Sequence, residues 1–149
     1  MDVTKALDSV SHKSMVKAAG PAGFPTSLLH YIQSLYIGTT TRFKVGKSIG
    51  QLICVKWGVH QGDPLSPVLF NHIIDWVLNE IDPQVGVTLE GSLRLNHLAF
   101  ADDVSLMSEE NEAALRVSKQ FASGLSEVDL LPNARKSPTL TIIVDELKK

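Results

Sequence analysis

Apolar residues recur at the spacing of an amphipathic helix in four parts of the chain. The pattern predicts helices over residues 15–19, 26–38, about 64–80 and 109–126. Gly20-Pro21 and Gly38 mark the ends of the first two helices, and Thr26 is expected to cap the second. Pro64 suits the first turn of the third helix, which has the widest apolar face.

Shorter runs of β-branched and apolar residues predict strands between these helices. They cover residues 2–6, 39–45, 51–57, 85–89, 93–100, 104–107 and 139–144. Residues 46–50 are expected to form a hairpin loop and residues 90–92 a turn. Strands mixed with helices that can cover one face predict an α+β fold, with a small antiparallel sheet backed by helices in a single domain over 1–149.

Composition narrows the class of protein. The 149 residues are 44% hydrophobic and 20% charged, which excludes a disordered or collagen-like chain. Cys54 is the only cysteine, so an internal disulfide and a cysteine-built zinc site are excluded. The five histidines lack metal-ligand spacing, and we expect them at the surface or at helix caps. Without a signal-like N-terminus or an apolar run of roughly 18 residues, we expect a protein of the nucleus or cytoplasm, neither secreted nor membrane-bound.

The net charge of −2 hides an asymmetry along the sequence. Residues 1–57 carry seven basic and two acidic side chains, whereas residues 58–149 carry seven basic and fourteen acidic ones. This division suits a side that faces a polyanion, joined to a carboxylate-rich centre. An unevenly charged solvated surface explains it equally well.

Two adjacent acids, Asp102 and Asp103, stand between apolar runs, where the tip of a hairpin is expected. A third acid, Asp2, lies at the start of another predicted strand. Three carboxylates at strand ends could hold two Mg²⁺ ions about 3.5–4 Å apart, the arrangement of two-metal phosphoryl transfer. The alternative for the pair alone is a polar hairpin turn, in which aspartate is common.

A second candidate is the loop that contains Gly58, Gln61 and Gly62 and leads into the predicted helix at Pro64. Its glycines allow a ligand to approach the backbone closely, and Gln61 can hydrogen-bond the edge of a base or sugar. The adjacent helix N-terminus favours phosphate. An ordinary strand-to-helix turn remains the alternative for this loop taken alone.

Taken together, these segments resemble the reverse transcriptases. Residues 58–70 resemble motif B of that family, and Phe100-Ala101-Asp102-Asp103 resembles motif C. Residues 2–8 resemble motif A, usually Asp-x-x-Lys-Ala-Phe-Asp, and residues 124–137 resemble motif D. The order is that of the family and spans essentially the whole chain. The wording is most similar to non-LTR retrotransposons, especially those that insert into ribosomal RNA genes.

The resemblance implies a polymerase palm, a ferredoxin- or RRM-like antiparallel sheet backed by helices. It implies an RNA-directed DNA polymerase that extends a DNA primer with deoxynucleoside triphosphates on an RNA template. Asp2, Asp102 and Asp103 match the catalytic acids that bind two Mg²⁺ ions, with Mn²⁺ as a substitute, and Lys136 matches a general acid for pyrophosphate. Gln61 and Gly62 match the loop that contacts template and nucleotide.

Two departures from the family pattern alter what we expect. Leu7 stands where the family has an aromatic residue that excludes ribonucleotides. The motifs begin at residue 2 and end near residue 137, so the resemblance implies a reverse transcriptase fold that lacks fingers, thumb and endonuclease. We therefore expect exposed apolar surface, pairing with missing polymerase segments or a second copy, and weak or no activity alone.

Two alternatives to a working polymerase remain open. One is a catalytically inactive retroelement remnant that binds nucleic acid or protein, if it has a role at all. The other is a different two-metal phosphotransfer or phosphatase site, against which the residues resembling motif B argue.

Overall fold

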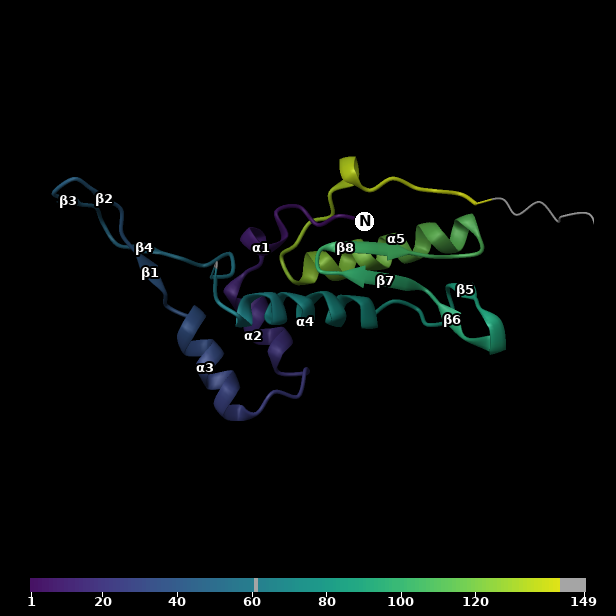
Figure 1. The fold of residues 1–149 in the computed structure, drawn as a ribbon, viewed down its shortest axis with the longest axis horizontal. Helices are drawn as coiled ribbons and strands as arrows, with labels where there is room; N and C mark the ends of the chain where they lie inside the picture. Colours follow the sequence, from purple (N-terminus) through teal and green to yellow (C-terminus); the bar gives the residue numbers. More distant parts are fainter. Residues whose placement is uncertain (61, 143–149) are drawn as a thin grey trace, which may run out of the picture.

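Helices form the centre of the computed structural model, which describes residues 1–60 and 62–142 (Figure 1). The α-helices are α1 (Ala6–Ser9), α2 (His12–Ala19), α3 (Thr26–Tyr36), α4 (Leu65–Asn79) and α5 (Asn111–Glu127). Two short 3₁₀ turns are η1 (Glu90–Ser92) and η2 (Ala134–Lys136). The four predicted helices are confirmed within a few residues, and α1 was not predicted.

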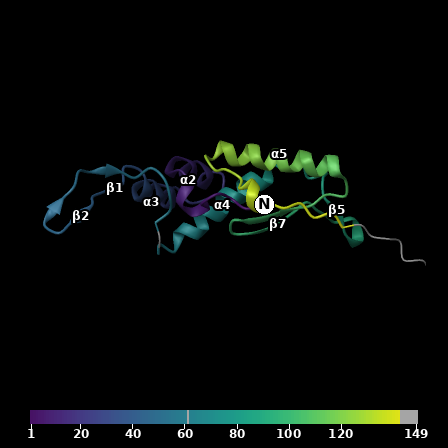
Figure 2. The ribbon, with the colours of Figure 1, turned by 90° about the horizontal axis from the view of Figure 1, so that it is seen from above.

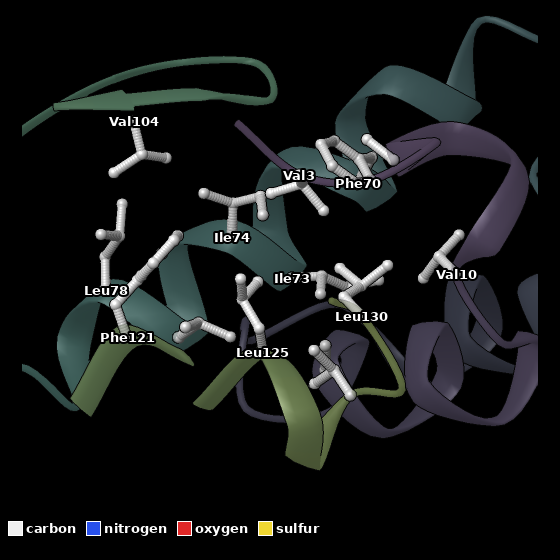
Figure 3. Packing of buried hydrophobic residues seen from close by; sticks show 14 of the residues in the cluster. Val3, Val10, Phe70, Ile73, Ile74, Leu78, Val104, Phe121, Leu125 and Leu130 are labelled. Atoms are coloured by element: carbon white, nitrogen blue, oxygen red, sulfur yellow. The ribbon is translucent and has the colours of Figure 1, made fainter. Parts of the chain in front are cut away.

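The core lies where α2 and α5 pack against α4. Figure 3 shows side chains from α4 and α5 meeting Val3, Val104 and Leu130. The two longer helices approach closely at Gly124, where a Cβ atom would lie 2.8 Å from Val77 Cγ1. The wide apolar face of α4 therefore lies against Val3, near the start of the chain, and against Val104, far along the sequence.

The strands form four separate antiparallel pairs rather than one sheet. These pairs are β1 (Thr40–Thr41) with β4 (Ile53–Cys54), β2 (Lys44–Val45) with β3 (Ser48–Ile49), β5 (Val87–Thr88) with β6 (Arg94–Leu95), and β7 (His97–Phe100) with β8 (Asp103–Leu106). Helices mixed with small antiparallel strands confirm the α+β class. Within the described residues, the part of the predicted small antiparallel sheet that contains Asp102 and Asp103 is the β7–β8 pair, to which Asp2 adds one bridge.

Three local expectations need correction. In the predicted strand 2–6, only Asp2 and Val3 form isolated bridges, because Lys5 adopts a left-handed conformation (φ 46°, ψ 43°) and α1 follows it. The residue that precedes α3 is Pro25 rather than Thr26, and no side chain caps that helix. Residues 139–142 form no regular element, and residues 143–144 of that predicted strand lie outside the described residues.

The β1–β4 and β2–β3 pairs form a hairpin, residues 39–56, that projects away from the helices in both views (Figures 1 and 2). We call it the ribbon. Every residue from 40 to 54 is exposed. Exposed apolar surface was expected and is present here, and also at Phe100, which is 85% exposed on the β7–β8 hairpin. Within residues 1–60 and 62–142, no helix is long and apolar enough to span a membrane.

Candidate active site

The β7–β8 hairpin carries Asp102 and Asp103 at its tip. Phe100 pairs with Asp103, so Ala101 and Asp102 form a two-residue loop. Ala101 has a φ of 53°, a left-handed value that residues with a Cβ atom seldom adopt. A II′ turn requires a positive φ at the first loop position, and such strained positions concentrate at functional sites. The turn leaves Asp102 half-buried and Asp103 exposed.

Asp2 lies beside this hairpin, although roughly 100 residues separate it from Asp103. The two residues form an antiparallel bridge, and the Val104 backbone N–H donates to the Met1 carbonyl oxygen at 2.9 Å. Residues directly opposite each other in an antiparallel pair project their side chains to the same face. Asp2 and Asp103 therefore share one face.

The segment 131–137 closes the other side of Asp2. Val3 bridges to Pro132, and the Asn133 backbone N–H donates to the Asp2 carbonyl oxygen at 2.8 Å. The Asn133 side chain donates from Nδ2 to Asp2 Oδ2 at 2.9 Å, and the Asp2 backbone N–H donates to Ser137 Oγ at 3.1 Å. These bonds fix the position of Asp2 and the orientation of its carboxylate.

Lys136 is exposed and lies in η2, within the segment that surrounds Asp2. Its backbone N–H donates to the Asn133 carbonyl oxygen at 3.0 Å, which forms the 3₁₀ turn. The lysine is thus three residues from the asparagine that holds the Asp2 carboxylate. This placement brings the segment resembling motif D to the same side of the molecule as Asp2.

The donor chemistry at this place fits a divalent cation only in part. Asp2, Asp102 and Asp103 offer carboxylate oxygens, the ligands that Mg²⁺ prefers. Their backbone positions are adjacent through the Asp2–Asp103 bridge and the two-residue turn. Across the described part of the chain, however, no three His, Cys, Asp or Glu side chains converge closely enough to hold a metal ion. The backbone positions of the three aspartates are adjacent, whereas their carboxylate groups do not converge on one point.

The loop before α4 is held against the α1 region. The Gly58 backbone N–H donates to the Val10 carbonyl oxygen at 2.8 Å, and a Cβ atom at Gly58 would lie 3.2 Å from the Asp8 carbonyl oxygen. Gly62 has a φ of 90° and open space around it, so its backbone is accessible. Just before α4, the Asp63 side chain accepts a hydrogen bond from the backbone N–H of Leu65, the first residue of the helix, at 2.9 Å. The predicted site residue Gln61 lies outside the described residues.

Leu7 lies in α1 next to this loop. Its carbonyl oxygen accepts a hydrogen bond from the Val59 backbone N–H at 2.8 Å. Its side chain is 45% exposed. The residue predicted to face the sugar is therefore available to a ligand beside the Gly58–Gly62 loop.

His12 forms a buried polar connection that sequence analysis missed. It is 3% exposed, so the expected surface position is wrong for this histidine, whereas its contact with Tyr36, the last residue of α3, is of the expected helix-cap kind. Its Nδ1 lies 2.7 Å from the Tyr36 carbonyl oxygen and its Nε2 lies 2.9 Å from the Gly58 carbonyl oxygen. The Tyr36 ring stacks on His60 at 4.7 Å, and Ser66 Oγ donates to the His60 carbonyl oxygen at 2.7 Å. This group ties α2 and α3 to the loop.

Different signals were available for the missed residues. Asn133 lies inside the stretch that resembles motif D, so its side chain could have been considered as a partner of Asp2. His12 lies between the predicted strand 2–6 and the predicted helix 15–19 and lacks any motif-like neighbour, so only the fold reveals the two carbonyl oxygens around its ring.

Comparison with known proteins identifies the class to which this fold and site belong. Residues 1–146 match the family model described as reverse transcriptase (RNA-dependent DNA polymerase). Because the match covers nearly the whole chain, the chain belongs to the reverse transcriptase family.

Several curated relatives are Pol polyproteins of R2 retrotransposable elements. The chain is 38% identical over 143 residues to the type-1 element R2 polyprotein of Nasonia vitripennis, covering 96% of this chain and 14% of that protein. It is 36% identical to one from Popillia japonica (95% and 20%) and 34% identical to the type-2 element R2DM polyprotein of Drosophila melanogaster (95% and 13%). The chain thus spans at most a fifth of these relatives, and the predicted resemblance to non-LTR retrotransposons is confirmed.

Proposed function

We propose that residues 1–149 form the palm of an RNA-directed DNA polymerase from a non-LTR retroelement, acting inside the cell in the nucleus or cytoplasm. It would transfer deoxynucleotides from their triphosphates to the 3′-hydroxyl of a DNA primer on an RNA template. The observation that carries this proposal is the bridge between Asp2 and Asp103, which joins the segments resembling motifs A and C. The family match supports the same reaction class.

In this proposal Asp2, Asp102 and Asp103 would hold two Mg²⁺ ions, or Mn²⁺ in their place. Bound there, the ions would make the primer hydroxyl a better nucleophile and neutralise charge on the triphosphate. The chain's own residues arrange the ligands. Asn133 fixes Asp2 by donating to Oδ2, and the positive φ of Ala101 presents Asp102 at the end of the hairpin.

The remaining roles belong to residues on either side of this pair. Lys136 is proposed to give a proton to the leaving pyrophosphate, because it is exposed and lies in the segment around Asp2. Gln61 and Gly62 are proposed to contact the template and incoming nucleotide. Leu7 is proposed to lie against the sugar, since its exposed side chain neighbours the same loop.

Primer extension on an RNA template tests this function. Because the chain covers 14% of a relative such as the Nasonia vitripennis polyprotein, the assay is run twice, with the chain alone and with residues 1–146 replacing the matched segment of that relative. Asp102→Asn and Asp2→Asn should reduce extension by at least about 100-fold, and Lys136→Ala by a similar factor. The matched control is Asp75→Asn, an exposed acid on α4. Equal rates for Asp102→Asn and Asp75→Asn would refute the proposal.

A second candidate function is a nucleic-acid- or protein-binding module without catalysis. The observation that favours it is that the described residues hold no three-acid cluster suited to a metal ion. This alternative predicts that the protein binds a primer–template and that Asp102→Asn leaves this binding unchanged. It also predicts that the relative carrying residues 1–146 extends no primer at any Mg²⁺ or Mn²⁺ concentration.

A further inference from the structure

The ribbon, residues 39–56, carries several large apolar side chains that are exposed to solvent. Its large apolar side chains are open to solvent: Phe43 is 70% exposed, Val45 78%, Ile49 64%, Leu52 57% and Ile53 42%. A two-stranded hairpin is at best marginally stable alone in water, and exposed apolar patches of this kind mark binding surfaces. The ribbon therefore has the properties of a binding surface.

The charge of the ribbon points to the chemistry of that partner. Arg42, Lys44, Lys47 and Lys56 are its charged residues, and no acid occurs anywhere from residue 37 to residue 62. The rest of the chain is acidic enough to bring the net charge to −2. A local excess of four positive charges on a projecting, exposed element attracts a polyanion, because binding releases the counterions of its phosphates.

The shape of the ribbon distinguishes between kinds of nucleic acid. Two strands about 4.8 Å apart, with their side chains, make an element roughly 10 Å across. The major groove of B-form DNA is about 12 Å wide and admits a two-stranded ribbon, whereas the major groove of A-form RNA is too narrow. Proteins that bind single strands use rows of aromatic side chains, and the ribbon has one aromatic residue, Phe43.

We infer that the ribbon is a duplex-DNA-binding arm that enters the major groove. Lys44 lies in β2 and Lys47 in the turn that joins β2 to β3, where they reach phosphates, and Arg42 lies between β1 and β2. Ile49 lies directly opposite Lys44 in the antiparallel pair and therefore shares its face. On that face, Ile49 contacts the apolar edges of bases. The inference does not depend on polymerase activity, because the ribbon projects away from the N-terminus of the chain and from the β7–β8 hairpin (Figure 1).

Binding measurements with matched charge variants test the inference. We compare Lys44→Gln/Lys47→Gln with Arg116→Gln/Lys119→Gln, which removes two exposed positive charges from α5. Fluorescence anisotropy with a labelled DNA duplex of about two helical turns, across a salt series without Mg²⁺ or nucleotides, gives the affinity and its salt slope. Losing two phosphate contacts should lower the slope of log K against log salt by about 1.8 and the affinity by on the order of tenfold or more. The α5 variant should leave the slope unchanged.

The same variants are tested on duplex RNA and single-stranded DNA of equal length. The inference requires that the ribbon variant lose most on duplex DNA. A loss as large on either other probe, or the same loss in the α5 variant, overturns it. Dimerisation that disappears in Val45→Ser/Ile49→Ser while DNA binding stays unchanged would instead assign the ribbon to a second copy. Circular dichroism checks that each variant keeps its helices, and primer extension by the same proteins separates this result from failure of the polymerase proposal.

Discussion

Replacing His12 should release the loop before α4. The carbonyl oxygens of Tyr36 and Gly58 lie 2.7 Å and 2.9 Å from the ring nitrogens of His12. Because a neutral imidazole donates from one ring nitrogen, His12→Ala removes at least one of these two hydrogen bonds. Each buried carbonyl left without a partner costs roughly 1–3 kcal/mol. The variant should therefore lose about 1–3 kcal/mol, a substantial share of the 5–15 kcal/mol that typical domains have.

Urea unfolding followed by circular dichroism measures this loss. The control is His30→Ala, because His30 is exposed on α3 and its removal should change the free energy of unfolding by less than about 0.5 kcal/mol. His12→Gln can keep one donor and should lose less than His12→Ala, which keeps the experiment informative if the alanine variant fails to fold.

Amide hydrogen exchange then tests the link to the loop. The Gly58 and Val59 N–H groups donate to the carbonyl oxygens of Val10 and Leu7, so they should exchange faster in His12→Gln than in His30→Ala. If His12→Ala stays within about 1 kcal/mol of the parent and these two amides exchange at the parent's rate, His12 does not hold the loop.

Three other changes have measurable outcomes. Gly124→Ala places a Cβ atom 2.8 Å from Val77 Cγ1, so overpacking of about 1–3 kcal/mol outweighs the gain in helix propensity of up to about 1 kcal/mol; higher stability in urea would contradict this. The backbone N–H of Thr88 donates to Glu109 and holds the pKa of that carboxyl below its usual value, so its stabilisation is complete above the pKa of an unfolded glutamate and is lost as the pH falls through the lowered value. Melting temperatures from about pH 6 to about pH 3 should thus fall less steeply in Glu109→Gln than in the parent. In the relative that carries residues 1–146, Leu7→Phe should strengthen the rejection of ribonucleotides by on the order of a few kcal/mol. Equal ratios of ribonucleotide to deoxyribonucleotide incorporation with Leu7 and with Phe would show that residue 7 does not face the sugar.

The helices were predictable because their signals are local. The apolar faces of α4 and α5 repeat at helical spacing, so both elements follow from the sequence within a few residues. The β7–β8 hairpin was equally clear, since two apolar runs flank a pair of acids. The conformation of residues 2–6 was not predictable, because the left-handed conformation at Lys5 ends the extended segment. This conformation usually occurs at glycine, and the sequence has no glycine there.

The sequence could indicate candidate site residues but not the contacts that they make. The family resemblance indicated Asp2, Asp102 and Asp103, and the Asp2–Asp103 bridge brings two of them to one face. The hydrogen bond from Asn133 to Asp2 and the burial of His12 depend on packing between residues more than 20 positions apart. Periodicity and motifs describe neighbours in sequence, so they carry no information on such pairs.

The position of Asp2 between Asp103 and Asn133 has a consequence for the order in which the molecule assembles. Joining Asp2 to Asp103 closes a loop of roughly 100 residues, at an entropic cost of about 4 kcal/mol, whereas the helices form from residues close in sequence. The packing of Val3 and Val104 in the core, together with the hydrogen bonds around Asp2, must offset that cost. The pairing should therefore form after the helices during folding and open before them under stress. A weakened core would then disable the site at temperatures where the helices still persist.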